Sequence, residues 1–171
     1  MTPPIRWGPT FWTFFHTISL CYPANPSDID KEMAIGLINS IKYILPCQAC
    51  RDHFSKNISS NPLDSNDLAS KENFIEWFID IHNVVNKMLK KHQLSYEEAM
   101  RRLNSLDINN YKNLFAQVIN MINVNNNDKK QRKHVLQFIT SCLHFGNMPI
   151  PSNMDYTTLS NFKIMIKPLL H

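Results

Sequence analysis

The segment 70-SKENFIEWFIDIHNVVNKMLKK-91 predicts a long amphipathic helix. Its large apolar residues recur at intervals of three or four positions, which places them on one face of a helix. These residues are Phe74, Trp77, Phe78, Ile81, Val85, Met88 and Leu89. The whole chain has 171 residues, of which 43% are hydrophobic, so it can bury a core. Because it holds only 3 glycines and no regular run of short valine- and isoleucine-rich strands, we expect an all-α protein.

Helical patterns and capping signals continue along the rest of the chain. Ser27 with Asp30, and Ser95 with Glu98, place side-chain acceptors where helix starts need them. After Asp107 the composition becomes rich in asparagine, so we expect one domain over 1–104 and a helical C-terminal extension over 105–171. The further helices that we expect cover 7–21, 28 to about 45, 47 to about 58, 95 to about 103, 111–124, 129–145 and 156–170.

Two cysteines stand where the third helix is expected to begin, in 45-LPCQACRDH-53. A helix start with Arg51 beside it favours the thiolate form of Cys47 and Cys50. This spacing fits a redox disulfide, a zinc site or two structural thiols. The helical surroundings disfavour a thioredoxin-like site, and a zinc site lacks a second Cys-x-x-Cys or a His-x₃₋₅-His motif. A redox dithiol needs an electron acceptor, which implies a bound cofactor.

Several aromatic and amide side chains are suited to a flat ligand with polar edges. Tryptophan rings stack on other rings, and histidine and asparagine form hydrogen bonds to ring nitrogens and carbonyls. The alternative is that the tryptophans belong to the core and that the asparagines reflect a chain rich in this residue. The candidate residues are Trp12, His16, Trp77, His82, Asn83 and Asn86.

Neither charge nor hydropathy indicates a nucleic-acid or membrane partner. The net charge is +4, and the basic residues are scattered apart from the run Lys129–His134. We interpret this run as a solvated helix start, because no recognition module accompanies it. No apolar stretch reaches the ~20 residues of a membrane span, and the N-terminus lacks the features of a secretory signal or transit peptide. We therefore expect a cytoplasmic protein without a membrane span.

Three motifs follow one another along the chain: Trp7-Gly8-x-x-x-Trp12-x-x-x-His16, Cys47-x-x-Cys50 and His82-Asn83-x-Val85-Asn86-Lys87. In their order and separations they resemble the Erv/ALR family of FAD-linked sulfhydryl oxidases. The residues around the first two motifs resemble members from large DNA viruses in particular. The resemblance implies a four-helix bundle with a short fifth helix that holds FAD.

The resemblance also implies which residues contact FAD. Family members place flavin contacts on the first helix, adenine, ribose and flavin contacts on the fourth, and phosphate contacts on the lysines that follow it. No metal is implied. The matching residues are Gly8, Trp12, His16, Tyr22, Trp77, His82, Asn83, Asn86, Lys87, Lys90 and Lys91.

The family's mechanism assigns Cys47 to the substrate and Cys50 to the flavin. A substrate thiolate attacks Cys47, a second substrate thiol resolves the mixed disulfide, and Cys50 passes two electrons to FAD and from there to O2, giving H2O2. The implied partners are a protein dithiol, O2 and a second copy of the chain, since family members often dimerise through the first two helices. In viral members the disulfide passes to a separate small dithiol protein.

The chain departs from the family's cellular members at three places. Pro9 replaces an arginine, and Ile79 replaces a cysteine of a structural disulfide. A second, shuttle cysteine pair is missing, because only Cys21 and Cys142 remain and they form no motif. We therefore expect the substrate to reach the first cysteine of the pair directly. The competing hypothesis is a non-enzymatic helical module with a zinc site or a structural disulfide.

Overall fold

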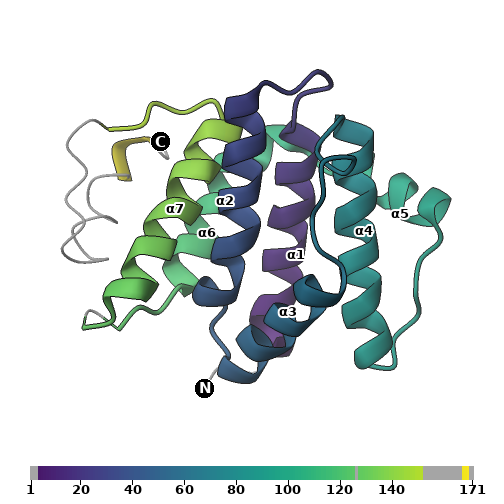
Figure 1. The fold of residues 1–171 in the computed structure, drawn as a ribbon, viewed down its shortest axis with the longest axis horizontal. Helices are drawn as coiled ribbons and strands as arrows, with labels where there is room; N and C mark the ends of the chain where they lie inside the picture. The colour runs from purple at the N-terminus through teal and green to yellow at the C-terminus, as the bar shows by residue number, and fades with distance from the viewer. Residues whose placement is uncertain (1–3, 126, 152–166, 170–171) are drawn as a thin grey trace.

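The structure is a computed structural model that describes residues 4–125, 127–151 and 167–169. Within these ranges it is built from helices alone (Figure 1), which confirms the all-α prediction. The elements are α1 (Pro4–Cys21), α2 (Asp28–Ile44), α3 (Gln48–Ser60), α4 (Lys71–Met88), α5 (Tyr96–Leu103), η1 (Ile108–Asn110), α6 (Tyr111–Met121), α7 (Lys129–Phe145) and η2 (Lys167–Leu169).

Helices α1 to α4 form the predicted bundle, and α5 lies beyond α4. Helix α1 packs against α4 and α6, while α2 packs against α3 and α7. In Figure 1, α2 lies beside α7 and α1 beside α4, and α3 runs obliquely across one end of the bundle. The aromatic residues of α1 supply the centre of the core, since Phe11, Phe14, Phe15 and Ile18 are all buried. Burying each such side chain contributes roughly 1.5–3 kcal/mol.

The C-terminal extension packs on the bundle of the same chain. Phe14 of α1 lies 5.7 Å from Phe115 of α6 and 6.4 Å from Phe138 of α7, ring centre to ring centre. Ser141 donates a hydrogen bond from Oγ to the carbonyl oxygen of Met33 at 2.8 Å, which joins α7 to α2. Buried residues of α6 and α7 therefore share one continuous apolar cluster with α1, α2 and α4.

Helix α4 ends at Met88, three residues before the predicted end. Lys90 adopts a positive φ of 54°, and the amide of Lys91 donates back to the carbonyl of Asn86 at 2.8 Å. These are the features of a Schellman cap, which normally carries glycine at the left-handed position. The predicted apolar face is wrong at its end, because Met88 and Leu89 are 45% and 56% exposed.

Two other helices have bounds that differ from the prediction, and a third lies largely outside the described residues. Helix α1 begins at Pro4, three residues earlier than predicted, so Pro9 lies inside it and withholds one helical hydrogen bond. Helix α6 ends at Met121 instead of residue 124. The side chain of Gln131 binds the backbone that follows this end, and its Oε1 accepts a hydrogen bond from the amide of Asn125 at 2.9 Å. The helix predicted over 156–170 lies largely outside the described residues, which show only the short turn η2 in this range.

Candidate functional site

The two cysteines of the Cys-x-x-Cys motif lie at the start of α3. Cys47 is the N-cap residue, and its Sγ accepts a hydrogen bond from the amide of Cys50 at 3.3 Å. Both side chains are partly buried against the main apolar cluster. The sulfur of Cys47 thus takes the position of an N-cap oxygen, at the positive end of the helix dipole.

The pKa of Cys50 is raised to about 12 by burial, by the hydrogen bond with Cys47 and by the charge of Cys47. A favoured thiolate was expected at both positions, so this expectation is wrong for Cys50 while the pair is reduced. Arg51 donates from Nε to the carbonyl of Leu45 at 2.6 Å. Burial lowers the pKa of Arg51, and the charges of Asp128, Cys47 and Asp52 oppose that shift. The guanidinium therefore lies within electrostatic reach of the first cysteine.

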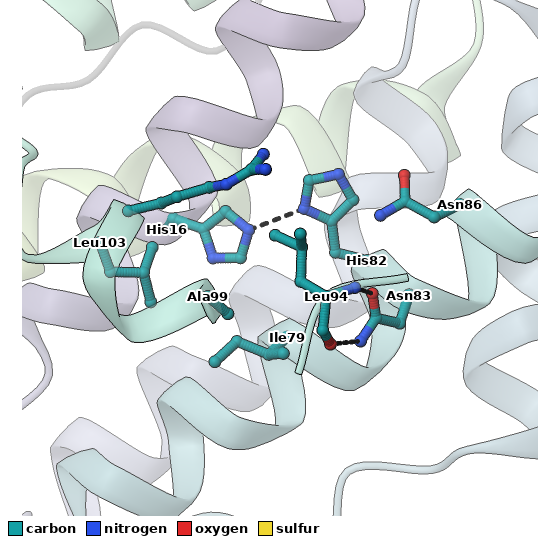
Figure 2. Close-up of a pocket in the computed structure, with 9 residues that line it drawn as sticks. His16, Ile79, His82, Asn83, Asn86, Leu94, Ala99 and Leu103 are labelled. Carbon is teal, nitrogen blue, oxygen red and sulfur yellow. Dashed lines mark hydrogen bonds between the residues drawn. The ribbon is translucent and has the colours of Figure 1, made fainter. Parts of the chain in front are cut away.

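Three rings from α1 and α4 form an aromatic cluster. The indole of Trp12 and the imidazole of His82 are stacked, with 3.9 Å between ring centres and 1° between planes. Nε2 of His16 lies 2.9 Å from Nδ1 of His82, so one of the two nitrogens donates to the other (Figure 2). The structure thus brings His82 to Trp12 and His16, which lie 66 or more positions before it in the sequence.

A small cavity of about 100 Å³ adjoins this cluster, between α1, α4 and α5. Figure 2 shows the amide of Asn83 turned to the backbone of Leu94, with two hydrogen bonds of 2.9 and 3.0 Å. This pairing fixes the segment between α4 and α5 and so closes one side of the cavity. The lining residues are His16, Ile79, His82, Asn83, Asn86, Leu94, Ala99, Arg102 and Leu103.

Arg102 is the site residue that the sequence did not reveal. It lines the cavity from α5, and its charge helps to lower the pKa of His82. An arginine in the last turn of a short helix is also an ordinary surface feature, so its sequence position alone gave no signal.

Both imidazoles of the cluster are neutral at pH 7. Burial, followed by the nearby His82, lowers the pKa of His16 to about 3. Burial also lowers the pKa of His82 to about 4, with smaller contributions from Lys91 and Arg102. A neutral pair has one donor and one acceptor nitrogen on each ring, which suits the polar edge of an uncharged aromatic ring system.

Two buried nitrogens at the predicted site have no hydrogen-bond partner among the residues that the structure describes. They are Nδ1 of His16 and Nε1 of Trp77. A buried polar group without a partner costs roughly 1–3 kcal/mol, so such groups point to a missing polar ligand. Trp77 does not line the cavity and instead packs in the main apolar cluster, against which both cysteines also pack.

The remaining residues that were predicted to contact FAD lie in different surroundings. Lys87, Lys90 and Lys91 are exposed at the end of α4, and the charge of Lys91 reaches His82. Tyr22 is fully buried, and its hydroxyl donates to the carbonyl of Leu68 at 3.0 Å. Gly8 lacks a visible steric role, because a Cβ there would meet nothing within 4 Å.

Two further features are absent from the part of the chain that the structure describes. Over 4–125, 127–151 and 167–169, no three His, Cys, Asp or Glu side chains are grouped so that they could hold a metal ion. Among the helices in those ranges, none is both long and apolar enough to cross a membrane.

Comparison with known proteins gives consistent matches. The model of the Erv1 / Alr family matches residues 9–104. The protein "Probable FAD-linked sulfhydryl oxidase R368" of Acanthamoeba polyphaga mimivirus is 42% identical over 100 residues, which cover 58% of this chain and 70% of that protein. "Putative FAD-linked sulfhydryl oxidase 347L" of Invertebrate iridescent virus 6 is 36% identical over 103 residues, 58% of this chain and 93% of that protein. The crystal structure of the yeast Erv1 core superposes with a TM-score of 0.55 at 30% identity, over 63% of this chain and 91% of that one.

Proposed function

The chain belongs to the Erv1 / Alr family, and from that premise we propose that it is an FAD-dependent sulfhydryl oxidase that converts protein dithiols to disulfides. One observation carries this proposal. Cys47 and Cys50 meet at a helix N-terminus with 3.3 Å between the Sγ of the first and the amide of the second. They pack against the same apolar cluster as Trp77, whose indole nitrogen is buried without a partner in the described chain.

The residues of the site fit FAD. Trp12 and His82 offer ring faces for stacking, while His16 and Trp77 offer buried nitrogens for a polar ring edge. When bound, FAD supplies an acceptor for the electron pair of the reduced cysteines and a route from there to O2, which leaves as H2O2. The cavity of about 100 Å³ is smaller than the ~300–1,000 Å³ of common ligand pockets, so we propose that the Trp12–His82 contact gives way to the ligand.

Disulfide exchange is the step that the chain's own residues carry out. A substrate thiolate attacks Sγ of Cys47, a new S–S bond forms, and the Cys47–Cys50 bond breaks with its electron pair on Cys50. The second substrate thiolate then attacks the substrate sulfur of the mixed disulfide and releases Cys47. The substrate is oxidised by two electrons, and the enzyme pair is reduced by two.

The electrostatics of the pair suit Cys50 as the leaving group. Burial is the first cause that raises its pKa, and burial persists during the reaction. The hydrogen bond with Cys47 and the charge of Cys47 also raise the pKa, and both are lost once Cys47 is bonded to a substrate sulfur, while the amide hydrogen bond that lowers the pKa remains. A leaving thiol with a lower pKa departs faster, so the loss of these two contributions favours departure of Cys50 as the substrate sulfur bonds to Cys47.

We further propose that the enzyme works in the cytoplasm, in a relay that forms disulfides in virion proteins. Its similarity to FAD-linked sulfhydryl oxidases of a mimivirus, an iridescent virus and African swine fever virus supports this setting. Within the 171 residues Cys47 and Cys50 form the pair and Cys21 and Cys142 form no motif, and we propose that a separate dithiol protein attacks Cys47 directly. Oxidation of small thiols but of no protein dithiol would contradict the relay.

The family resemblance implies a homodimer through the first two helices. In this chain α6 packs on α1 and α7 packs on α2. We therefore propose that any homodimer forms through another surface. Sedimentation velocity of wild type and of variants with charged substitutions on exposed residues of α1 and α2 tests this, since such variants should leave the mass unchanged.

The absorption spectrum of the freshly purified protein tests the proposed function. A bound flavin gives a yellow protein with a band near ~450 nm, and dithiothreitol under air should then yield H2O2 in step with its oxidation. A zinc module or a structural disulfide, the competing hypothesis, gives a colourless protein. A colourless protein that neither binds added FAD nor consumes dithiothreitol would contradict the proposal.

A further inference from the structure

The start of α7 lies against the end of α2, four residues before Cys47. Nε2 of Gln131 donates to the carbonyl oxygen of Tyr43 at 3.0 Å, across 88 positions of sequence. The rings of Tyr43 and His134 are stacked, with 3.9 Å between centres and 3° between planes. Because four peptide units join Tyr43 to Cys47, their Cα atoms lie within about 15 Å of each other. Figure 1 shows this end of α7 beside the end of α2 from which the chain turns into α3.

Arg51 supplies a second link between the cysteine and the extension. Its guanidinium interacts electrostatically with both Cys47 and Asp128. Asp128 is the N-cap residue of α7, where its carboxylate accepts a hydrogen bond from the amide of Gln131 at 2.9 Å. The first residues of α7 are therefore close to the reactive end of α3, and no motif predicted this proximity.

Three lysines gather around the Tyr43–His134 stack. The Nζ atoms of Lys42 and Lys130 lie 5.6 and 5.7 Å from the centre of the Tyr43 ring. Lys42, Lys130 and Lys133 all help to lower the pKa of His134, after burial as the first cause. We call these three lysines the basic rim. Lys130 and Lys133 are exposed, so the rim faces solvent.

The charge of the basic rim is not neutralised within the part of the chain that the structure describes. None of its three lysines forms an ion pair there. Asp52 and Asp128 both interact electrostatically with Arg51. A patch of one sign beside a reactive group attracts partners of opposite charge and raises their rate of encounter.

We propose that the basic rim is a docking surface for an acidic segment that flanks the dithiol of a substrate protein. This inference rests on the proposed function, because it assumes that a substrate thiolate attacks Cys47. Carboxylates on the substrate meet the ammonium groups of the rim, and the attached cysteine is thereby held near the first cysteine of the pair. The C-terminal extension then contributes to substrate choice, and an acidic dithiol protein is the substrate class.

Two synthetic peptides and one pair of variants test this proposal. Both peptides carry Cys-x-x-Cys at the same position, flanked by glutamates in one and by lysines in the other. The variants are Lys130→Glu in the rim and Lys112→Glu at the start of α6. Each lysine is the second residue of its helix and is exposed, so the two variants share the same change in charge and in helix-dipole energy. The readout is the ratio of kcat/KM for the acidic peptide to that for the basic peptide, which does not depend on the active fraction of the protein.

Wild type should favour the acidic peptide, and Lys130→Glu should lower the ratio roughly five- to tenfold at low salt. Lys112→Glu should keep the wild-type ratio, and 0.5 M NaCl should bring all ratios closer together, since salt screens exposed charges. A wild-type ratio of one or less, or an equal fall in both variants, would overturn the docking proposal. Wild type that oxidises neither peptide nor dithiothreitol would instead contradict the proposed oxidase function.

Discussion

The neutral His16–His82 pair should make the protein less stable in mild acid. In an unfolded chain a histidine has a pKa near ~6.5. In the folded chain the pKa values are about 3 for His16 and about 4 for His82. Between these values the unfolded state binds more protons than the folded state, so the free energy of unfolding rises with pH. The stabilisation is complete above pH ~6.5 and is lost as the pH falls toward the folded values.

The magnitude follows from the size of the pKa shift. At pH 5 an unfolded histidine is largely protonated while His16 stays neutral, and this difference is worth about 2 kcal/mol relative to pH 8. His82 is less buried than His16, so its contribution is discounted for solvent screening. The pair should therefore contribute roughly 2–4 kcal/mol to the loss of stability between pH 8 and pH 5.

Urea unfolding of flavin-free protein, followed by circular dichroism at pH 8 and pH 5, measures this loss. His16→Gln removes one titrating ring and keeps a polar side chain, so it should lose about 2 kcal/mol less than wild type over this range. His53→Gln is the matched control, because His53 is an exposed histidine on α3. It should lose as much stability as wild type. Equal losses for wild type and His16→Gln would refute the neutral pair.

Three further predictions concern the extension, the end of α4 and the cofactor. Phe138 is fully buried beside Phe14, so Phe138→Ala should lower the free energy of unfolding by about 3–5 kcal/mol in urea titrations; a loss below ~1 kcal/mol would contradict shared packing of extension and bundle. Lys90→Gly should raise the free energy of unfolding by about 1 kcal/mol, and with it the melting temperature, because glycine relieves the positive φ of 54°. An unchanged melting temperature would contradict a strained cap. Trp12→Ala removes a stacking ring and should lose FAD during gel filtration, whereas undiminished absorbance near ~450 nm would contradict a stacking role.

Local features of the fold were predictable from the sequence because their causes are local. The expected N-cap at Ser27 and the expected capping box at Ser95 are both present, and at both positions the structure shows the reciprocal hydrogen bonds from side chain and backbone. Helix α7 has the predicted bounds, since Asp128 caps its start and Gly146 follows its end. Periodicity and caps act over a few residues, so one sequence contains the information they need.

The failures arise where distant segments meet. The apolar faces of the extension were visible in the sequence, but their partners on α1 and α2 were not. Tyr22 packs on Phe74, at a ring distance of 4.4 Å, a contact that its place after the first motif did not predict. Lys90 takes a left-handed conformation that residue preference disfavours, because it completes the cap of α4. In each case tertiary packing outweighed the local pattern.

The candidate site was predictable in part for the same reason. Motif spacing was enough to single out Trp12, His16 and His82, which the structure joins in one cluster. It gave no indication that Asn83 binds the backbone of Leu94, or that Arg102 reaches the cavity from α5. Those two roles depend on how the segment after α4 folds back, which no local signal specifies.

Turnover of Cys50→Ser tests the central claim most directly, because it separates electron transfer from cofactor binding. Cys21→Ser is the matched control, since Cys21 is a partly buried single cysteine outside the motif. Oxidation of dithiothreitol should be abolished in Cys50→Ser while the absorbance near ~450 nm remains, and Cys21→Ser should keep both. Wild-type oxidation by Cys50→Ser would contradict the account of this protein as an oxidase that works through the Cys47–Cys50 pair.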